Sequence, residues 1–235
     1  MTDSRLKPKQ TNGMSHIQET ITRLHNELSP EGVELVAVSK FHPAAAIMEA
    51  YEAGQRIFGE SRVQELAEKI PALPQDIRWH FIGHLQTNKV RPLIGKVAMI
   101  ESVDSERLLA KIDAESRAAG VTTRVLMQVH VAQEETKFGF TPEELLSYFS
   151  ERKFESLTNT HLCGVMGMAS NTCDRGRVAA DFAAIAAVHR NILAAAPDLR
   201  NFDVLSMGMS DDYRLAIEAG SNLVRIGTDI FGGRQ

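Results

Sequence analysis

The feature that most constrains the fold is a regular alternation of short apolar segments with helix-like segments along nearly the whole chain. Short apolar runs that end at turn residues predict β-strands, and the stretches between them predict helices. Eight alternations without a break in composition predict one α/β domain over residues 15–235, a (β/α)8 TIM barrel with an extra N-terminal helix at Ser15–Leu28. An open doubly wound sheet shows the same alternation, but no G-x-G-x-x-G motif opens the first strand–helix turn, so the barrel is favoured. The predicted strands are Leu35–Lys40, Arg56–Gly59, Trp79–Gly83, Ala98–Val103, Arg124–Val131, His161–Met168, Phe202–Gly208 and Leu223–Gly227.

Start signals mark several of the predicted helices. Ser61 with Gln64, and Thr141 with Glu144, have the spacing of a capping box, in which a hydroxyl and a longer polar side chain satisfy the first backbone N–H groups. Ser210, followed by two aspartates, predicts another helix start. The longest helix is predicted between Asp174 and Ala196.

Composition excludes several classes of protein. The net charge of −4 over 235 residues argues against a nucleic-acid scaffold, which needs a clustered basic surface. No apolar run approaches the about 20 residues that cross a bilayer, so no membrane span is expected. Residues 1–14 are polar, lack the apolar core of a signal peptide and predict a disordered tail. Cys163 and Cys173 are expected to be reduced thiols, the first buried and the second exposed, which favours the cytoplasm. The protein is expected to be a monomer.

Polar and glycine-rich segments follow the predicted strands where barrels carry their chemistry, at the carboxyl ends. Lys40 ends the first predicted strand, and the segments Ser206–Asp212 and Arg225–Gly232 follow or complete the seventh and eighth. Glycines, the hydroxyls of Ser206 and Thr228 and a helix start are what a phosphate site requires, and barrels often bind phosphate at these two loops. Because the first and eighth strands of a barrel are neighbours, the Lys40 amine would face a phosphate site there. Such an amine can form an imine with the aldehyde of a phosphorylated ligand.

Each of these residues also has an ordinary structural interpretation. Lys40 alone reads as a surface lysine at a strand end, and Arg225 as half of a salt bridge in the barrel mouth. Ser61 is as well explained by a helix cap as by a ligand contact. His80 and His84 are four residues apart, but no cysteine or acidic residue has the spacing of a third ligand, so a structural role is favoured over a metal site.

Five motifs resemble those of the pyridoxal phosphate homeostasis proteins, the single-domain relatives of alanine racemase. They are "AVSK" at Ala37–Lys40, "FGES..QE" at Phe58–Glu65, "WHFIGHLQTNK" at Trp79–Lys89, "LSMGMSDD" at Leu205–Asp212 and "VRIGTDIFG" at Val224–Gly232. The resemblance implies a barrel of the fold-type III class that carries pyridoxal 5′-phosphate (PLP) as an imine on Lys40. By motif position, it implies that Ser206 and Met207 with Gly227 and Thr228 hold the phosphate, and that Arg225 faces the pyridine nitrogen. Ser61 stands where many relatives have asparagine.

The same resemblance implies PLP (vitamin B6) homeostasis with little or no catalysis, no metal, and PLP-dependent apoenzymes as partners. Alanine racemase takes a tyrosine base from the partner subunit's second domain, whereas Tyr51, Tyr148 and Tyr213 all fall in predicted helices here. An arginine at the ring nitrogen would also weaken the ring as an electron sink. The alternatives are a PLP-dependent amino-acid racemase-type enzyme and a cofactor-free Schiff-base aldolase that acts on a sugar phosphate.

Overall fold

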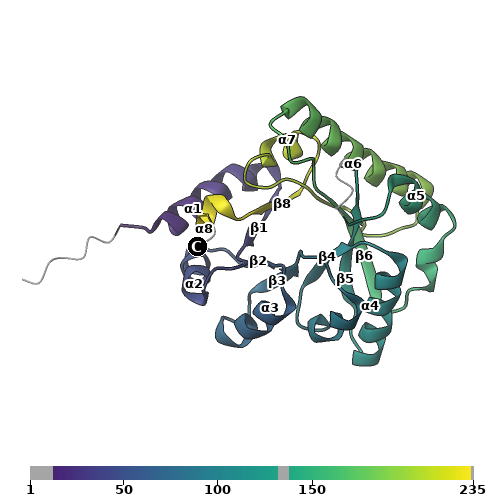
Figure 1. Cartoon of the computed structure of the whole chain (residues 1–235), viewed down its shortest axis with the longest axis horizontal. Helices are drawn as coiled ribbons and strands as arrows, with labels where there is room; N and C mark the ends of the chain where they lie inside the picture. The colour runs from purple at the N-terminus through teal and green to yellow at the C-terminus, as the bar shows by residue number, and fades with distance from the viewer. Residues whose placement is uncertain (1–12, 132–137, 234–235) are drawn as a thin grey trace, which may run out of the picture.

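A computed structural model describes residues 13–131 and 138–233. Within these ranges eight parallel strands form a closed barrel in sequence order, and the strand ring and its surrounding helices are visible in Figure 1. The ring closes where β8 pairs with β1, with Val36 opposite Arg225. The predicted TIM barrel is therefore confirmed and the open sheet is excluded. The predicted disordered tail lies outside the described residues apart from Gly13 and Met14. The strands are β1 Glu34–Val38, β2 Ile57–Glu60, β3 Arg78–Phe81, β4 Met99–Val103, β5 Thr123–Val129, β6 Thr160–Gly167, β7 Val204–Ser206 and β8 Leu223–Ile226.

Helices surround the barrel and connect its strands, as expected for parallel strands that need crossover connections. Two 3₁₀ turns take the place of a helix between β3 and β4, η3 (Thr87–Lys89) and η4 (Arg91–Leu93). Further 3₁₀ turns are η1 (Ser29–Glu31), η2 (Ile70–Ala72) and η5 (Lys153–Ser156). The α-helices are α1 His16–Leu28, α2 Ala44–Glu52, α3 Val63–Lys69, α4 Glu106–Ala119, α5 Pro142–Ser150, α6 Arg175–Ala195, α7 Tyr213–Glu218 and α8 Thr228–Phe231.

The extra N-terminal helix is present as α1 and begins with a capping box between Ser15 and Gln18. One side of α1 is buried, and the helix contacts α2, β1 and α8. The His16 ring nitrogen Nε2 lies 3.2 Å from the carbonyl oxygen of Asp229 in α8. The first helix therefore packs beside the last one, as Figure 1 shows.

Of the helix starts predicted from the sequence, those of α5 and α6 are confirmed and those of α3 and α7 are wrong. The capping box between Thr141 and Glu144 is confirmed at α5, and Asp174 caps α6 through two backbone N–H groups. At α3 the predicted Ser61 cap is wrong, because the helix begins at Val63 without a side-chain cap. At α7 the predicted Ser210 cap is also wrong, because that helix begins only at Tyr213.

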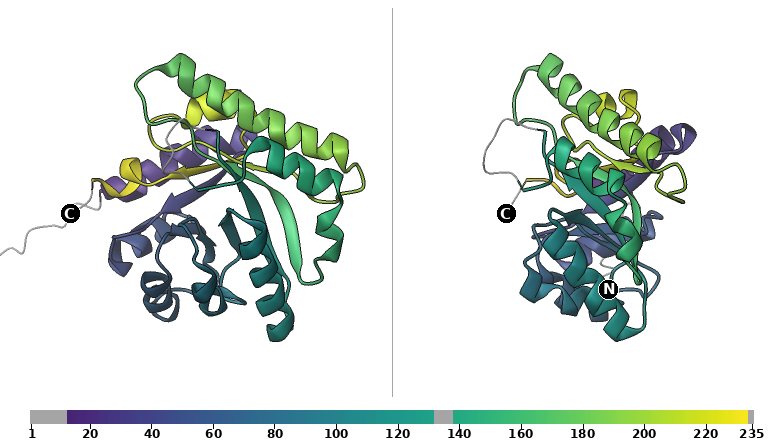
Figure 2. Two further views of the ribbon diagram at one scale, coloured as in Figure 1. Left: turned by 45° about the vertical axis from the view of Figure 1, so that its right-hand side comes forward. Right: turned by 90° about the vertical axis from the view of Figure 1, so that its right-hand side faces the viewer.

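Helix α6 corrects the expectation that no segment reaches membrane-spanning length. In the described part of the chain it is the one helix long and apolar enough to cross a bilayer, with a mean hydropathy of 1.3 over its most apolar window. In the views of Figure 2 it lies along the outside of the barrel next to α5, and it also contacts β6 and α7. Its side chains Phe182, Ile185 and Ile192 are fully buried. The large apolar side chains of this helix therefore pack within the fold.

Side chains fill the barrel in two layers. An apolar layer comprises Val36, Ile57, Met99, Leu126, Cys163, Met166 and Leu223, and it forms a cluster separate from the larger core between strands and helices. Cys163 is buried and Cys173 is exposed, as predicted. Closer to the carboxyl ends, the strands place buried polar side chains inside the ring: His80, Glu101, Ser206 and Arg225. Alternation along each strand explains this arrangement, since residues two apart face the same side of a sheet.

Candidate functional site

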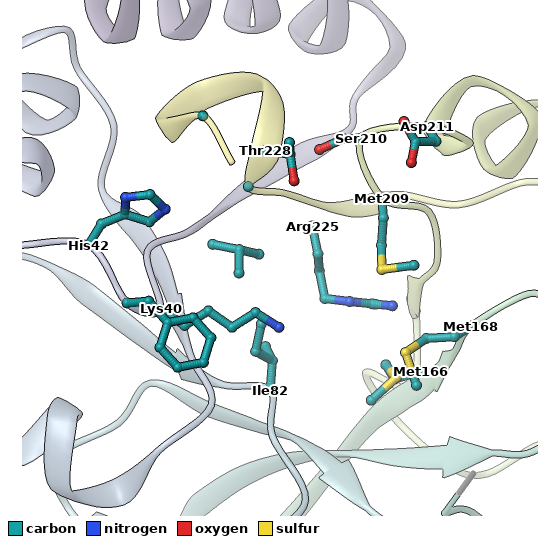
Figure 3. Close-up of a pocket in the computed structure, with 14 residues that line it drawn as sticks. Lys40, His42, Ile82, Met166, Met168, Met209, Ser210, Asp211, Arg225 and Thr228 are labelled. Atoms are coloured by element: carbon teal, nitrogen blue, oxygen red, sulfur yellow. The ribbon is translucent and has the colours of Figure 1, made fainter. Parts of the chain in front are cut away.

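A cavity of about 280 Å³ opens at the carboxyl ends of β1 and β8. This volume is close to the lower end of the range of small-molecule sites, about 300–1,000 Å³. Figure 3 shows the Lys40 side chain entering the cavity from one side, with Arg225 at its centre. The lining residues are Val38, Lys40, Phe41, His42, Ile82, Met166, Met168, Met209, Ser210, Asp211, Arg225, Gly227, Thr228 and Gly232.

Lys40 reaches the cavity because of the alternation along β1 and its extension. Val36 faces the barrel interior, Val38 lines the cavity, and Lys40 continues the same set of positions. The residue that follows, Phe41, has a φ of 68°, in the left-handed region that bulky side chains rarely adopt. The chain therefore turns sharply directly after the lysine.

The loops after β7 and β8 meet at one wall of the cavity. The backbone N–H of Asp229 donates to the Ser210 hydroxyl at 3.4 Å, which joins the two loops, and Ser210 and Thr228 both line the cavity. Gly208 makes the turn after β7 with a φ of 93°, and an added Cβ would lie 2.7 Å from the Tyr213 Cα. At Gly227 an added Cβ would lie 3.1 Å from the Val38 carbonyl oxygen, so the lack of a side chain permits this close approach to β1. Two hydroxyls on closely packed backbone form the type of wall that binds a phosphate.

Ser206 and Met207 are not among the residues that line this cavity. The Ser206 hydroxyl is fully buried, donates to Glu101 Oε2 at 2.7 Å and accepts from Arg225 Nη1. The Met207 side chain is also fully buried, and its backbone N–H donates to the Leu223 carbonyl at 3.1 Å. The structure therefore brings four of the six predicted site residues to the cavity and places these two behind its wall.

Arg225 is held from three sides. Besides the Ser206 contact, its Nη2 donates to the Gly167 carbonyl at 3.0 Å, and its Nη1 lies 3.7 Å from Glu101 Oε2. Burial lowers the pKa of Arg225, while the charges of Glu101 and Asp212 oppose that change. A guanidinium remains protonated in proteins, so Arg225 presents a fixed cation to the cavity.

Glu101 connects this arginine to His80. Its Oε1 lies 2.6 Å from His80 Nδ1, and both side chains are buried. Burial acts to raise the pKa of Glu101, but the contact with His80 and the charge of Arg225 outweigh it, so the pKa lies below its ordinary value. Glu101 is therefore ionised and balances the Arg225 charge. The His80 contact is a hydrogen bond within this network, and no group suited to a metal ion occurs in the described ranges.

His42 and three methionines complete the cavity. The His42 ring stacks on Phe231 with centroids 5.1 Å apart. Burial lowers the pKa of His42, and the Lys69 cation acts in the same direction, so the imidazole is neutral at pH 7. Met166, Met168 and Met209 form a polarisable apolar wall opposite Lys40, as Figure 3 shows. The cavity thus offers an amine, two hydroxyls, a fixed cation and an apolar wall to one ligand.

Comparison with known proteins identifies the family. The model of the alanine racemase N-terminal domain matches residues 14–235. The pyridoxal phosphate homeostasis protein of Vibrio alginolyticus is 35% identical over 236 residues, which cover 94% of this chain and 99% of the relative. The chain belongs to the pyridoxal phosphate homeostasis protein family. The family member of Helicobacter pylori is 39% identical over 85% of this chain and 87% of its own length. PipY of Synechococcus elongatus, solved with PLP bound, superposes with a TM-score of 0.84 at 37% identity and covers 92% of this chain and 100% of PipY.

Three residues that line or support the cavity were not predicted as site residues from the sequence: Ser210, His42 and Glu101. Ser210 was interpreted as a helix cap because two aspartates follow it. His42 carries no signal of its own in the sequence. Glu101 lies within an apolar strand and has no basic residue near it in the sequence. A buried carboxylate needs a partner, so this residue was a signal that a cation faces it inside the barrel. Ser61, which was left open between cap and ligand contact, neither caps α3 nor lines the cavity.

Proposed function

We propose that this chain binds pyridoxal 5′-phosphate in the cavity, as an imine on Lys40, and takes part in intracellular PLP (vitamin B6) homeostasis. The observation that carries the proposal is that the Lys40 side chain and the hydroxyls of Ser210 and Thr228 line one cavity with Arg225. PipY, which was solved with PLP bound, and the relatives named for PLP homeostasis support the same ligand. When bound, PLP supplies an aldehyde that condenses reversibly with an amine and a ring that can withdraw electrons.

The residues of the cavity fit the parts of this ligand. Ser210 and Thr228, with the backbone at Gly227, would hold the phosphate, because hydroxyls and close backbone approach suit its oxygens. Arg225 would face the pyridine nitrogen. Ser206 and Met207, assigned to the phosphate by motif position, would act indirectly, the first through Arg225 and the second through the end of β7.

Two features support a role with little or no catalysis. Arg225 does not release a proton, so it would leave a ring nitrogen unprotonated and the ring a weak electron sink. No tyrosine of the described residues lines the cavity. The Tyr51 hydroxyl donates to Asp76 at 2.7 Å, and the Tyr213 hydroxyl donates to Glu27 at 3.0 Å, so both hydroxyls are bonded to carboxylates that do not line the cavity. Tyr148 is buried in α5.

One observation favours the alternative, a PLP-dependent racemase-type enzyme. His42 is a neutral imidazole in the same cavity as Lys40, and a neutral imidazole can accept a proton. The carrier proposal predicts slow exchange of an amino-acid α-hydrogen in deuterated water by the PLP-saturated protein, far below the about 1–10³ s⁻¹ typical of enzymes. Exchange at enzymatic rates that His42→Ala abolishes would support the racemase-type alternative.

The cellular setting is part of the same proposal. A cytoplasmic monomer that delivers PLP to PLP-dependent apoenzymes, without nucleic-acid or membrane partners, is consistent with the net charge of −4 and with the relatives' names.

The absorption spectrum tests the proposed ligand. Protein mixed with PLP should show a visible imine band that borohydride removes, because reduction converts the carbon–nitrogen double bond to a single bond. Lys40→Ala should lack the band, whereas Lys89→Ala, which changes an exposed lysine after β3, should keep it. Absence of the band in the parent protein would exclude the imine, and a cofactor-free aldolase would then remain the better reading of Lys40.

A further inference from the structure

A cluster of three charged side chains, two of them buried, lies directly behind the lysine of the proposed site. It consists of Lys69 at the end of α3, Glu60 at the end of β2, and Glu65 in α3. Lys69 is 8% exposed and Glu60 is fully buried, so these charges were removed from water when the protein folded. Such groups are costly to bury unless they are paired, and nothing in the ligand contacts explains their presence.

Lys69 uses all three of its N–H donors in this cluster. Its Nζ lies 2.7 Å from Glu60 Oε1, 2.7 Å from Glu65 Oε1 and 2.9 Å from the carbonyl oxygen of Ser39. The Ser39 hydroxyl donates to the same Glu60 oxygen at 2.6 Å. The carbonyl of Ser39 belongs to the peptide unit that precedes Lys40. That peptide unit is therefore anchored to the Lys69 ammonium.

Glu65 anchors the peptide unit on the other side. The backbone N–H of Phe41 donates to Glu65 Oε1 at 2.6 Å, the oxygen that also accepts from Lys69. Phe41 has the left-handed φ of 68°, a conformation that surrounding contacts must hold in place for a side chain of this size. Both peptide units that flank the Lys40 Cα are thus bound to one Lys69–Glu65 pair.

We propose that Lys69 and Glu65 are positioning residues that fix the backbone on both sides of Lys40, so that its amine is directed into the cavity and reacts with an aldehyde ligand. The inference rests on the proposed function and extends it from the reacting residue to the residues that aim it. A lysine side chain has four methylenes that rotate, so the position and direction of its Cα–Cβ bond set the region that the amine can reach. The bond that depends on this aim is the carbon–nitrogen double bond formed when the Lys40 amine attacks an aldehyde and water leaves.

Two ligands distinguish a loss of Lys40 positioning from a general loss of ligand binding. PLP carries the aldehyde, whereas pyridoxine 5′-phosphate carries an alcohol at that position and cannot form an imine. Glu65→Ala removes the acceptor of the Phe41 N–H but leaves Glu60 to pair with Lys69. We expect its affinity for PLP to fall about tenfold or more, the effect of a lost hydrogen bond to a charged group. Its affinity for pyridoxine 5′-phosphate should stay within about twofold of the parent, since the phosphate and ring contacts are unchanged.

A conservative replacement of Glu65 should restore the affinity for PLP. Glu65→Gln keeps an oxygen that accepts from Phe41, so it should retain most of the PLP affinity that Glu65→Ala loses. Thermal unfolding in the absence of ligand shows whether Lys69→Met folds. The folded variant should lose affinity for PLP and keep its affinity for pyridoxine 5′-phosphate, as expected for Glu65→Ala. Equal losses of affinity for both ligands in Glu65→Ala, or an unchanged PLP affinity, would overturn the positioning role.

The variant Lys40→Ala distinguishes two outcomes: that the positioning role is wrong, and that the proposed function itself is wrong. If the proposed function is right, the parent binds PLP more tightly than pyridoxine 5′-phosphate, and Lys40→Ala loses that preference. A parent without the preference would contradict the proposed function itself, whatever the Glu65 variants do. A preference that depends on Lys40 but not on Glu65 would contradict only the positioning role.

Discussion

At the residue scale, two serines four positions apart have different environments. Ser210 lines the cavity beside Thr228, whereas the Ser206 hydroxyl bonds to Glu101 and Arg225 inside the barrel. Ser206 is the last residue of β7, and the strand fixes the side of the sheet that its side chain faces. Ser210 lies in the loop after β7, where this restriction no longer applies. The proposed site therefore assigns ligand contact to Ser210 and internal support to Ser206.

Removing the two cavity hydroxyls should weaken PLP binding without unfolding the barrel. Ser210→Ala and Thr228→Val each lose a hydrogen bond to a charged phosphate, so each should cost about 1.5–3 kcal/mol of binding free energy. The measurement is equilibrium titration with PLP, together with urea unfolding of the ligand-free variants. Their unfolding free energies should stay within about 1 kcal/mol of the parent, since Ser210→Ala also loses the contact with the Asp229 N–H.

Ser206→Ala is the matched control. It leaves Glu101 Oε2 and Arg225 Nη1 without their hydroxyl partner in a buried site, which should lower the unfolding free energy of the ligand-free protein by about 1–3 kcal/mol. If Ser206→Ala instead weakens PLP binding as much as Ser210→Ala and leaves stability unchanged, the phosphate contacts Ser206 as the motif position implied.

At the scale of elements, Asp113 ties helix α4 to the segment that leads into β6. Its Oδ1 accepts from the backbone N–H groups of Thr158 at 3.0 Å and Asn159 at 2.7 Å, and the side chain is largely buried. Burial acts to raise the pKa of Asp113, but these hydrogen bonds outweigh it and place the pKa below its ordinary value. The ionised form is therefore the one that the fold stabilises.

Replacing Asp113 should give a loss of stability that depends on pH. Asp113→Ala should lower the unfolding free energy by about 2 kcal/mol at pH 7. A depressed pKa contributes stability above the ordinary aspartate value of about 3.9, and that contribution is lost as the pH falls through the folded-state pKa. Urea unfolding from pH 7 down to acid pH should therefore show the difference between parent and variant becoming smaller below about pH 4. A difference that is the same at every pH, or one that the exposed Asp203→Ala also shows, would contradict this assignment.

The elements themselves were largely predictable, and their ends were not. All eight strands overlap the predicted segments, because buried parallel strands appear in a sequence as short apolar runs. The starts of α3 and α7 were misplaced because Ser61 and Ser210 stand in loops at the carboxyl ends of strands, and such loops take conformations that a local capping pattern does not describe.

At the scale of the whole molecule, the alternation and the missing glycine motif were sufficient to predict a barrel, but not the polar layer inside it. His80, Glu101, Ser206 and Arg225 come from β3, β4, β7 and β8, and the bond between Ser206 and Glu101 joins residues 105 positions apart. Contacts of this range depend on barrel closure and on strand register, which single residues in a sequence do not encode. The position of Lys40 at the cavity was predictable because it ends the first predicted strand, which neighbours the eighth in a closed barrel, and because its segment resembles a family motif.

The proposed function depends on Lys40 as the residue that binds PLP covalently. The most direct measurement is peptide mapping by mass spectrometry after PLP-loaded parent protein is reduced with borohydride and digested. We expect one pyridoxyl group per chain, located on the peptide that contains Lys40. Lys69, whose donors are all engaged, and the exposed Lys89 should remain unlabelled. A pyridoxyl group found mainly on Lys89, or spread over surface lysines at a stoichiometry that follows the PLP concentration, would contradict the claim.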